Sequence, residues 1–131
     1  MLTDWQVHKS NTIINYHNFF VDECHFVHEN FKKTFPDKDS TWGYHYYNVF
    51  AATSPSPIWY DLYKQLRTIV REYIGTEDPL WFQSWLNFHK PDQVLDWHDH
   101  NWPYHGYISI DPKGTRTVFK DYEVKNDIGN I

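Results

Sequence analysis

The spacing of apolar residues changes near residue 76, and this change limits the folds open to the chain. Before it, apolar residues recur every three or four positions, which is typical of amphipathic helices. After it, short apolar or alternating runs are separated by turn sequences such as KPD and PKG, which is typical of β-strands. Helices followed by short strands favour an α+β fold with a mainly β core, a β-sandwich or a jelly roll with the helices packed outside it.

Two helices are expected in the first part of the chain. The stretch 15–35 has apolar residues spaced four, three and four apart, and the stretch 54–75 has Pro57 in its first turn and Gly75 just after its last. Between them, 36–41 is expected to be a loop and 41–53 a strand. The second helix should pack one face against the sheet, formed by Ile58, Leu62, Leu66, Ile69, Val70 and Tyr73.

Strands are expected in the second part, and their number bears on the extent of the fold. The segments 80–89, 93–100, 104–111 and 115–124 have strand-like patterns, and the closing IGNI of 128–131 indicates a turn that opens another strand. The chain is therefore predicted to be one domain, 1–131, helical to about residue 79 and β from 80. A jelly roll needs about eight strands, so the chain is expected to be a C-terminally incomplete piece of a longer protein, inactive by itself. Its open sheet edges would pair with a second copy in a homodimer.

Charge and cysteine content exclude several classes of protein. The net charge of −5 argues against general nucleic-acid or membrane-surface binding. No apolar stretch reaches the roughly 18 residues of a membrane-spanning helix, so no membrane partner is expected. The single cysteine, Cys24, suits a reducing compartment, and a soluble cytoplasmic protein is predicted.

The nine residues WHDHNWPYH, 97–105, contain the strongest chemical signal. On a strand, His98 and His100 project from the same face, so both imidazoles can approach one cation. His105 follows on the next segment, where it would either complete the ligand set or orient a ligand, whereas His89 is expected to be structural. Imidazole ligands without thiolate suit Fe(II), Mn(II) or Zn(II), and two histidines with a third facial ligand are typical of non-haem iron oxygenases.

The stretch 81–119 resembles 2-oxoglutarate- and Fe(II)-dependent oxygenases of phage and marine microbial sequences. The shared elements are Ser-Trp-Leu-Asn at 84–87, Trp-His-x-His at 97–100 and the aromatic run into Asp-Pro at 111–112. The resemblance implies a double-stranded β-helix, with Fe(II) and 2-oxoglutarate as cofactors. It implies that His98 and His100 are metal ligands and that Asn87 contacts 2-oxoglutarate, a small-molecule co-substrate. Pocket residues would be Tyr104 and Tyr107, with walls from Trp85, Trp97 and Trp102; the primary substrate is not indicated.

Two departures from the family pattern leave alternatives open. The family usually has an acidic residue where His100 stands, so either the site is all-histidine or Asp96 or Asp99 takes part. The distal histidine and the basic residue that pairs with 2-oxoglutarate would both lie beyond Ile131, and Arg116 is not assigned that role. A cupin-type metal-binding protein, with His105 near the offset of its third ligand, is one alternative. A metal-free jelly roll that binds a partner through exposed aromatic residues is another.

Overall fold

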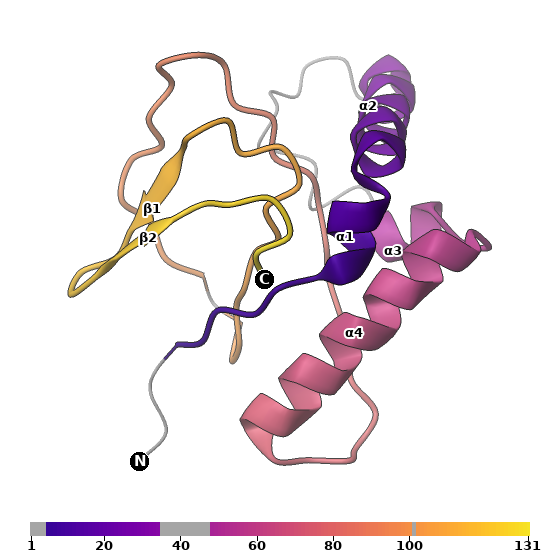
Figure 1. The fold of residues 1–131 in the computed structure, drawn as a ribbon, viewed down its shortest axis with the longest axis vertical. Helices are drawn as coiled ribbons and strands as arrows, with labels where there is room; N and C mark the ends of the chain where they lie inside the picture. The colour runs from indigo at the N-terminus through magenta and orange to yellow at the C-terminus, as the bar shows by residue number, and fades with distance from the viewer. Residues whose placement is uncertain (1–4, 35–47, 101) are drawn as a thin grey trace.

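The computed structural model of the chain describes residues 5–34, 48–100 and 102–131. Within these ranges, helices come first along the chain and two short strands follow, as Figure 1 shows. The helices lie on one side of the molecule and the strands on the other. The helices are α1 (Asn11–Asn15), α2 (His17–Thr34), α3 (Val49–Ala52) and α4 (Pro57–Ile74), and the strands are β1 (Arg116–Val118) and β2 (Glu123–Lys125).

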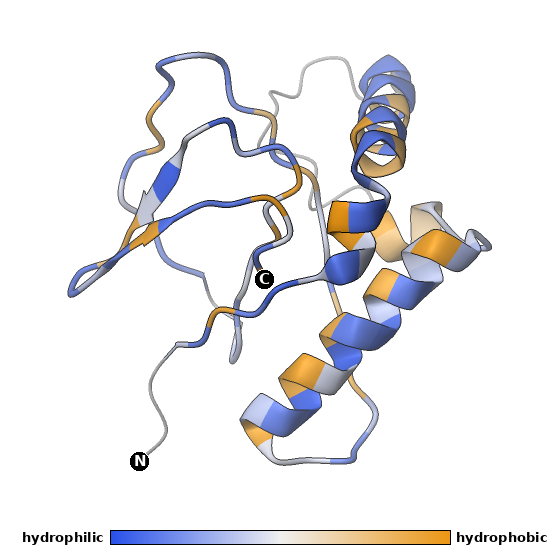
Figure 2. Cartoon of the chain, in the orientation of Figure 1, coloured by the Kyte–Doolittle hydropathy of each residue, from blue (hydrophilic) through white to orange (hydrophobic). Residues whose placement is uncertain are grey.

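Helix α4 forms where the sequence predicts it, because both of its ends carry local signals. The Ser56 hydroxyl accepts a hydrogen bond from the Trp59 backbone N–H, and Pro57 occupies the first turn. Gly75 ends the helix in the left-handed conformation, with φ of 76°. Apolar residues recur along the helix in Figure 2, and Trp59 and Leu62 are its buried members. Fewer residues of the predicted apolar face are buried than expected, since Leu66, Ile69 and Tyr73 are only half-buried.

Helix α2 also confirms the sequence prediction, and it contributes to the core. Phe20, Cys24 and Val27 are buried along one face, at the predicted spacing. The short helix α1 precedes it and was not anticipated. Ser10 caps α1 by accepting a hydrogen bond from the Ile13 backbone N–H.

The hydrophobic core is built by the helices, which corrects the prediction of a mainly β core. Its buried cluster comes from α1, α2, α3 and α4: Ile13, Phe20, Cys24, Val49, Trp59 and Leu62. The second half of the chain only covers this cluster, with partly buried side chains such as Leu86, Phe88, Ile108 and Ile110. The helical and strand-containing parts therefore share one core.

The predicted jelly roll is wrong. In the described residues the sheet has two strands, β1 and β2, paired antiparallel with Thr117 opposite Val124. The expected strand 115–124 is thus a hairpin, closed by a hydrogen bond from the Phe119 N–H to the Tyr122 carbonyl at 2.8 Å. The expected strands 80–89, 93–100 and 104–111 run without regular secondary structure. A strand needs a partner for its backbone groups, and all of 91–99 is exposed to solvent instead.

The predicted strand 41–53 is also wrong where the structure describes it. Residues 49–52 form α3, because the Asn48 side chain accepts a hydrogen bond from the Phe50 N–H and caps a helix. The rest of that stretch, and the loop expected at 36–41, lie outside the described residues. The KPD turn before residue 93 is confirmed by a hydrogen bond from the Gln93 N–H to the Lys90 carbonyl, at 3.1 Å.

Three distant segments lie side by side in what we call the terminal clasp: residues 8–10, 109 and 129–131. His8 and Ile131 exchange backbone hydrogen bonds of 2.8 and 2.9 Å. The Ser10 N–H donates to the Gly129 carbonyl at 2.7 Å, and the Gly129 N–H donates to the Ser109 carbonyl at 2.8 Å. In Figure 1 the C-terminus lies beside the segment that leads into α1.

Among the residues that the structure describes, no helix combines the length and the apolar character needed to cross a membrane.

Candidate metal centre

The histidines of the 97–105 segment lie in an irregular, solvent-exposed stretch. It follows the turn that contains Asp92, whose φ is 61°, and the structure describes it except at residue 101. His98 and His105 are exposed, whereas His100 is half-buried. The segment therefore presents its imidazoles at the surface, on backbone that is not part of a sheet.

The tautomer of His98 follows from one hydrogen bond. Its Nδ1 lies 2.8 Å from the backbone carbonyl oxygen of Asp96. Because a carbonyl oxygen only accepts, Nδ1 must carry the proton and donate it. In the neutral ring the lone pair is then on Nε2. A carbonyl bound to the second ring nitrogen is also the usual way in which metal-binding histidines are oriented.

The rings of His98 and His100 lie at a separation suited to two ligands of one cation. Their centroids are 5.1 Å apart and their planes are inclined by 82°. With metal–nitrogen bonds of about 2.1 Å, each ring centre lies roughly 3.2 Å from the metal, and angles of about 90–110° separate the two centres by roughly 4.5–5.3 Å. The predicted same-face pair is therefore brought together, although not by a regular strand.

His105 has a different relation to the pair. Its ring stacks on His100 with centroids 4.0 Å apart and planes inclined by 19°. Since nitrogen lone pairs lie in the ring planes, two nearly parallel rings do not direct them at one ion. In this arrangement His105 supports the His100 ring, and its role as a ligand stays a prediction. No group of three or more histidine, cysteine, aspartate or glutamate side chains able to hold a metal occurs among the described residues.

Desolvation and the charges of neighbouring imidazoles favour the neutral forms of His100 and His105. Desolvation, followed by the nearby charge of His98, lowers the pKa of His100, while Asp99 opposes the shift. Desolvation lowers the pKa of His105 as well, with smaller contributions from His100 and His98. Neutral imidazole is the form that binds metals, so both shifts favour ligand chemistry near pH 7.

Of the aromatic residues and predicted co-substrate contacts, Trp85 is the one with a ring contact to the described histidine cluster. The neighbouring segment reaches it through Trp85, whose ring centroid is 5.9 Å from that of His100. Asn87 is exposed and Tyr107 is half-buried. Tyr104 is directed toward α4, where its ring meets the edge of Tyr73 at 6.3 Å. Trp97 is 74% exposed, so it stands in solvent and does not wall a pocket as expected.

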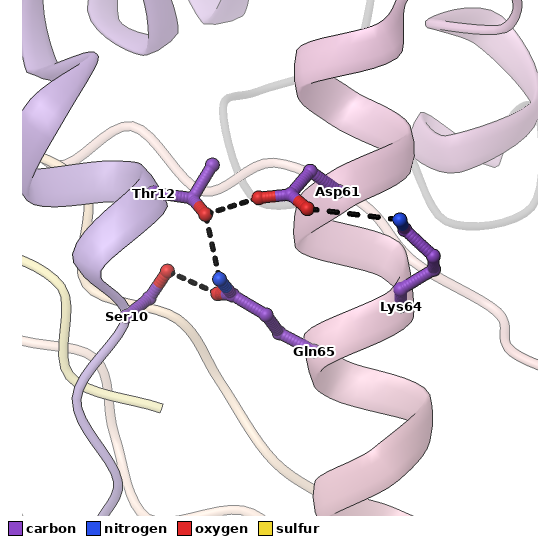
Figure 3. Close-up of polar contacts among 5 residues, drawn as sticks. All are labelled: Ser10, Thr12, Asp61, Lys64 and Gln65. Atoms are coloured by element: carbon purple, nitrogen blue, oxygen red, sulfur yellow. Dashed lines mark hydrogen bonds and ion pairs between the residues drawn. The ribbon is translucent and has the colours of Figure 1, made fainter.

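A second polar cluster, which sequence reasoning missed, joins α1 to α4 (Figure 3). The Ser10 hydroxyl donates to Gln65 Oε1 at 2.6 Å, and Gln65 Nε2 donates to Thr12 Oγ1 at 2.6 Å. Thr12 in turn donates to the carboxylate of Asp61. Ser10 and Thr12 are buried, so this chain of hydrogen bonds is structural. A sequence signal existed in Ser10, three residues before the apolar Ile13, as expected at the start of a helix.

Comparison with known proteins gives no match for this chain among family models, curated protein sequences or solved structures.

Proposed function

We propose that His98 and His100 are metal ligands of a non-haem Fe(II)- and 2-oxoglutarate-dependent oxygenase. The observation that carries the proposal is the hydrogen bond between His98 Nδ1 and the Asp96 carbonyl, which leaves the Nε2 lone pair available on a ring whose centroid is 5.1 Å from that of His100. The proposal depends on this local arrangement and on the sequence motif around it, since the described residues do not form the double-stranded β-helix of the family.

The donor set fits a divalent transition metal in its chemistry. Neutral imidazoles without thiolate suit iron, manganese or zinc. Fe(II), 2-oxoglutarate and O₂ would together supply oxidation of a substrate coupled to oxidative decarboxylation of the co-substrate to succinate and CO₂. The chain itself would hold the metal through His98 and His100 and orient His100 through the stacked ring of His105. Asn87 and Tyr107 are the proposed contacts of 2-oxoglutarate, whereas Tyr104 is directed toward α4. A reducing cytoplasm would keep both Cys24 and the iron reduced.

Metal binding is tested by anaerobic Fe(II) titration of the whole chain and of His98→Ala and His100→Ala. With two protein ligands the parent affinity should be weak, and each substitution should lower it at least tenfold. His89→Ala is the matched control, because His89 is an exposed histidine of the preceding segment outside the pair. Equal affinity in the parent and in both variants would refute the metal site.

The oxygenase assignment needs a second measurement. Addition of 2-oxoglutarate to the Fe(II)-loaded chain should produce the visible absorption of an iron–2-oxoacid chelate, and the band should be absent in His98→Ala. A chain that binds Fe(II) but shows no band with 2-oxoglutarate is not an oxygenase of this class. That result would leave a metal-binding protein that does not use 2-oxoglutarate.

A further inference from the structure

Helix α4 carries a row of cations on the side opposite its buried residues. Lys64, Arg67 and Arg71 are spaced three and four residues apart, so they share one face. At 1.5 Å rise per residue the row is about 10 Å long. In the part of the chain that the structure describes, the ion pair made by this row joins Lys64 to Asp61, at 3.8 Å between half-exposed side chains. A pair of that kind contributes little and leaves the cation accessible.

Two tyrosines lie among these cations on the same face. The rings of Tyr60 and Tyr63 stack, with centroids 6.1 Å apart and an interplanar angle of 24°. The Lys64 ammonium lies 5.3 Å from the Tyr60 ring centroid, and the Arg67 guanidinium lies 5.7 Å from that of Tyr63. Cation–π contacts hold the two long side chains against the helix, where Lys64 is exposed and Arg67 is half-buried.

A tryptophan from the next segment borders the same face. After Gly75 the chain turns and runs back past α4 (Figure 1). Two contacts define its course: Arg71 Nη2 donates to the Asp78 carbonyl at 3.3 Å, and the Phe82 ring meets the Tyr63 ring at 5.8 Å. The backbone at Trp81 therefore runs beside α4 between these points, and the Trp81 side chain is 98% exposed to solvent. Packing within the chain does not explain why so large an apolar side chain is exposed.

We propose that this α4 surface, formed by Tyr60, Tyr63, Lys64, Arg67, Arg71 and Trp81, binds a short stretch of single-stranded nucleic acid. Cations alternating with exposed aromatic rings are the combination that single strands require, because phosphates need positive charge and unpaired bases need a flat ring. A row of about 10 Å faces roughly two to three phosphates. The net charge of −5 argues against general nucleic-acid binding, so a local patch of this kind is the form that binding would take. The surface is separate from the histidine cluster, so the two proposals stand or fall independently.

The test is fluorescence anisotropy of labelled oligothymidylate and oligouridylate, titrated with the whole chain at several salt concentrations. Contact with two to three phosphates predicts that log K falls with log salt at a slope of about −1.4 to −2.1. Trp81→Ala should weaken binding about tenfold or more, since it removes a stacking platform. Lys64→Gln and Arg67→Gln should each weaken binding and make the slope of log K against log salt less negative by about 0.7.

Lys113→Gln is the control, because Lys113 is an exposed lysine on the PKG turn and not on α4. It should leave binding unchanged. The Trp81 side chain makes almost no packing contact, so circular dichroism should show an unaltered fold in Trp81→Ala. The proposal is overturned if no binding occurs at low salt, or if Trp81→Ala binds like the parent. It is also overturned if polyglutamate of equal charge competes as well as the oligonucleotide, since the surface would then recognise negative charge alone.

Discussion

Gly129 occupies the tightest point of the terminal clasp, and a methyl group added there should be costly. Its φ is 85°, and a Cβ atom would lie 2.9 Å from the Ser10 carbonyl oxygen and 3.0 Å from Ile14 Cγ1. The left-handed conformation costs a non-glycine residue about 1–2 kcal/mol. The steric clash with the Ser10 carbonyl oxygen, whose residue is held by the clasp hydrogen bonds, should add a further cost of about 1–3 kcal/mol. Gly129→Ala should therefore lower the free energy of unfolding by about 2–5 kcal/mol.

Gly114 supplies a matched control for this substitution. Its φ is 81°, almost the same, but an added Cβ would meet nothing within 4 Å. Gly114→Ala should cost only the conformational part, about 1–2 kcal/mol. Urea titrations monitored by tryptophan fluorescence give both values, and their difference isolates the steric part. If Gly129→Ala is no more destabilising than Gly114→Ala, the close approach of the clasp segments is incorrect.

Three further substitutions test the helical core. Leu62→Ala should lower the free energy of unfolding by about 2–5 kcal/mol because Leu62 is fully buried. Leu66→Ala should lower it clearly less in the same urea assay, because Leu66 is half-buried, and equal losses would contradict this packing. Thr12→Val breaks the polar cluster between α1 and α4 and should cost about 1–3 kcal/mol, whereas Thr68→Val, at an exposed site on α4, should be nearly neutral. Burial, aided by a neighbouring carboxylate, raises the pKa of the Cys24 thiol to about 12. As pH rises above about 9, the thiol ionises in the unfolded chain before it ionises in the folded one. The free energy of unfolding should therefore fall by up to about 1.4 kcal/mol per pH unit between pH 9 and 12. Cys24→Ala should lack this part of the pH dependence.

The helices were predictable because their signals are local. Ser56, Pro57 and Gly75 mark the ends of α4 within the sequence itself, and the periodicity of α2 needs no knowledge of its partners. The strands were not predictable in the same way. Alternating residues in 80–111 indicate an extended chain, but a strand exists only where a second segment supplies hydrogen bonds, and that requirement is not visible in one segment.

The histidine cluster was predicted in part. The i, i+2 spacing of His98 and His100 predicted that their rings lie close together, and their centroids are 5.1 Å apart. The carbonyl that fixes the His98 tautomer and the stacking of His105 on His100 depend on the local path of an irregular backbone, which spacing alone does not determine. The polar cluster at Thr12 needed the packing of α1 on α4, a contact between residues 49 positions apart.

The terminal clasp also has a consequence for the order of folding. Lys9 and Asn130 meet across 121 positions, so their contact closes nearly the whole chain into a ring. Loop-closure entropy grows only logarithmically, and closing this loop costs about 0.8 kcal/mol more than closing the α1–α4 contact. The slow formation of the clasp matters more than this difference in free energy, because contacts of high sequence separation form late in folding. The helices should thus assemble first and the clasp last. Since each of its three segments is hydrogen-bonded to a neighbour in the clasp, the amide protons of Ser10, Ser109, Gly129 and Ile131 should exchange with solvent in one shared opening event.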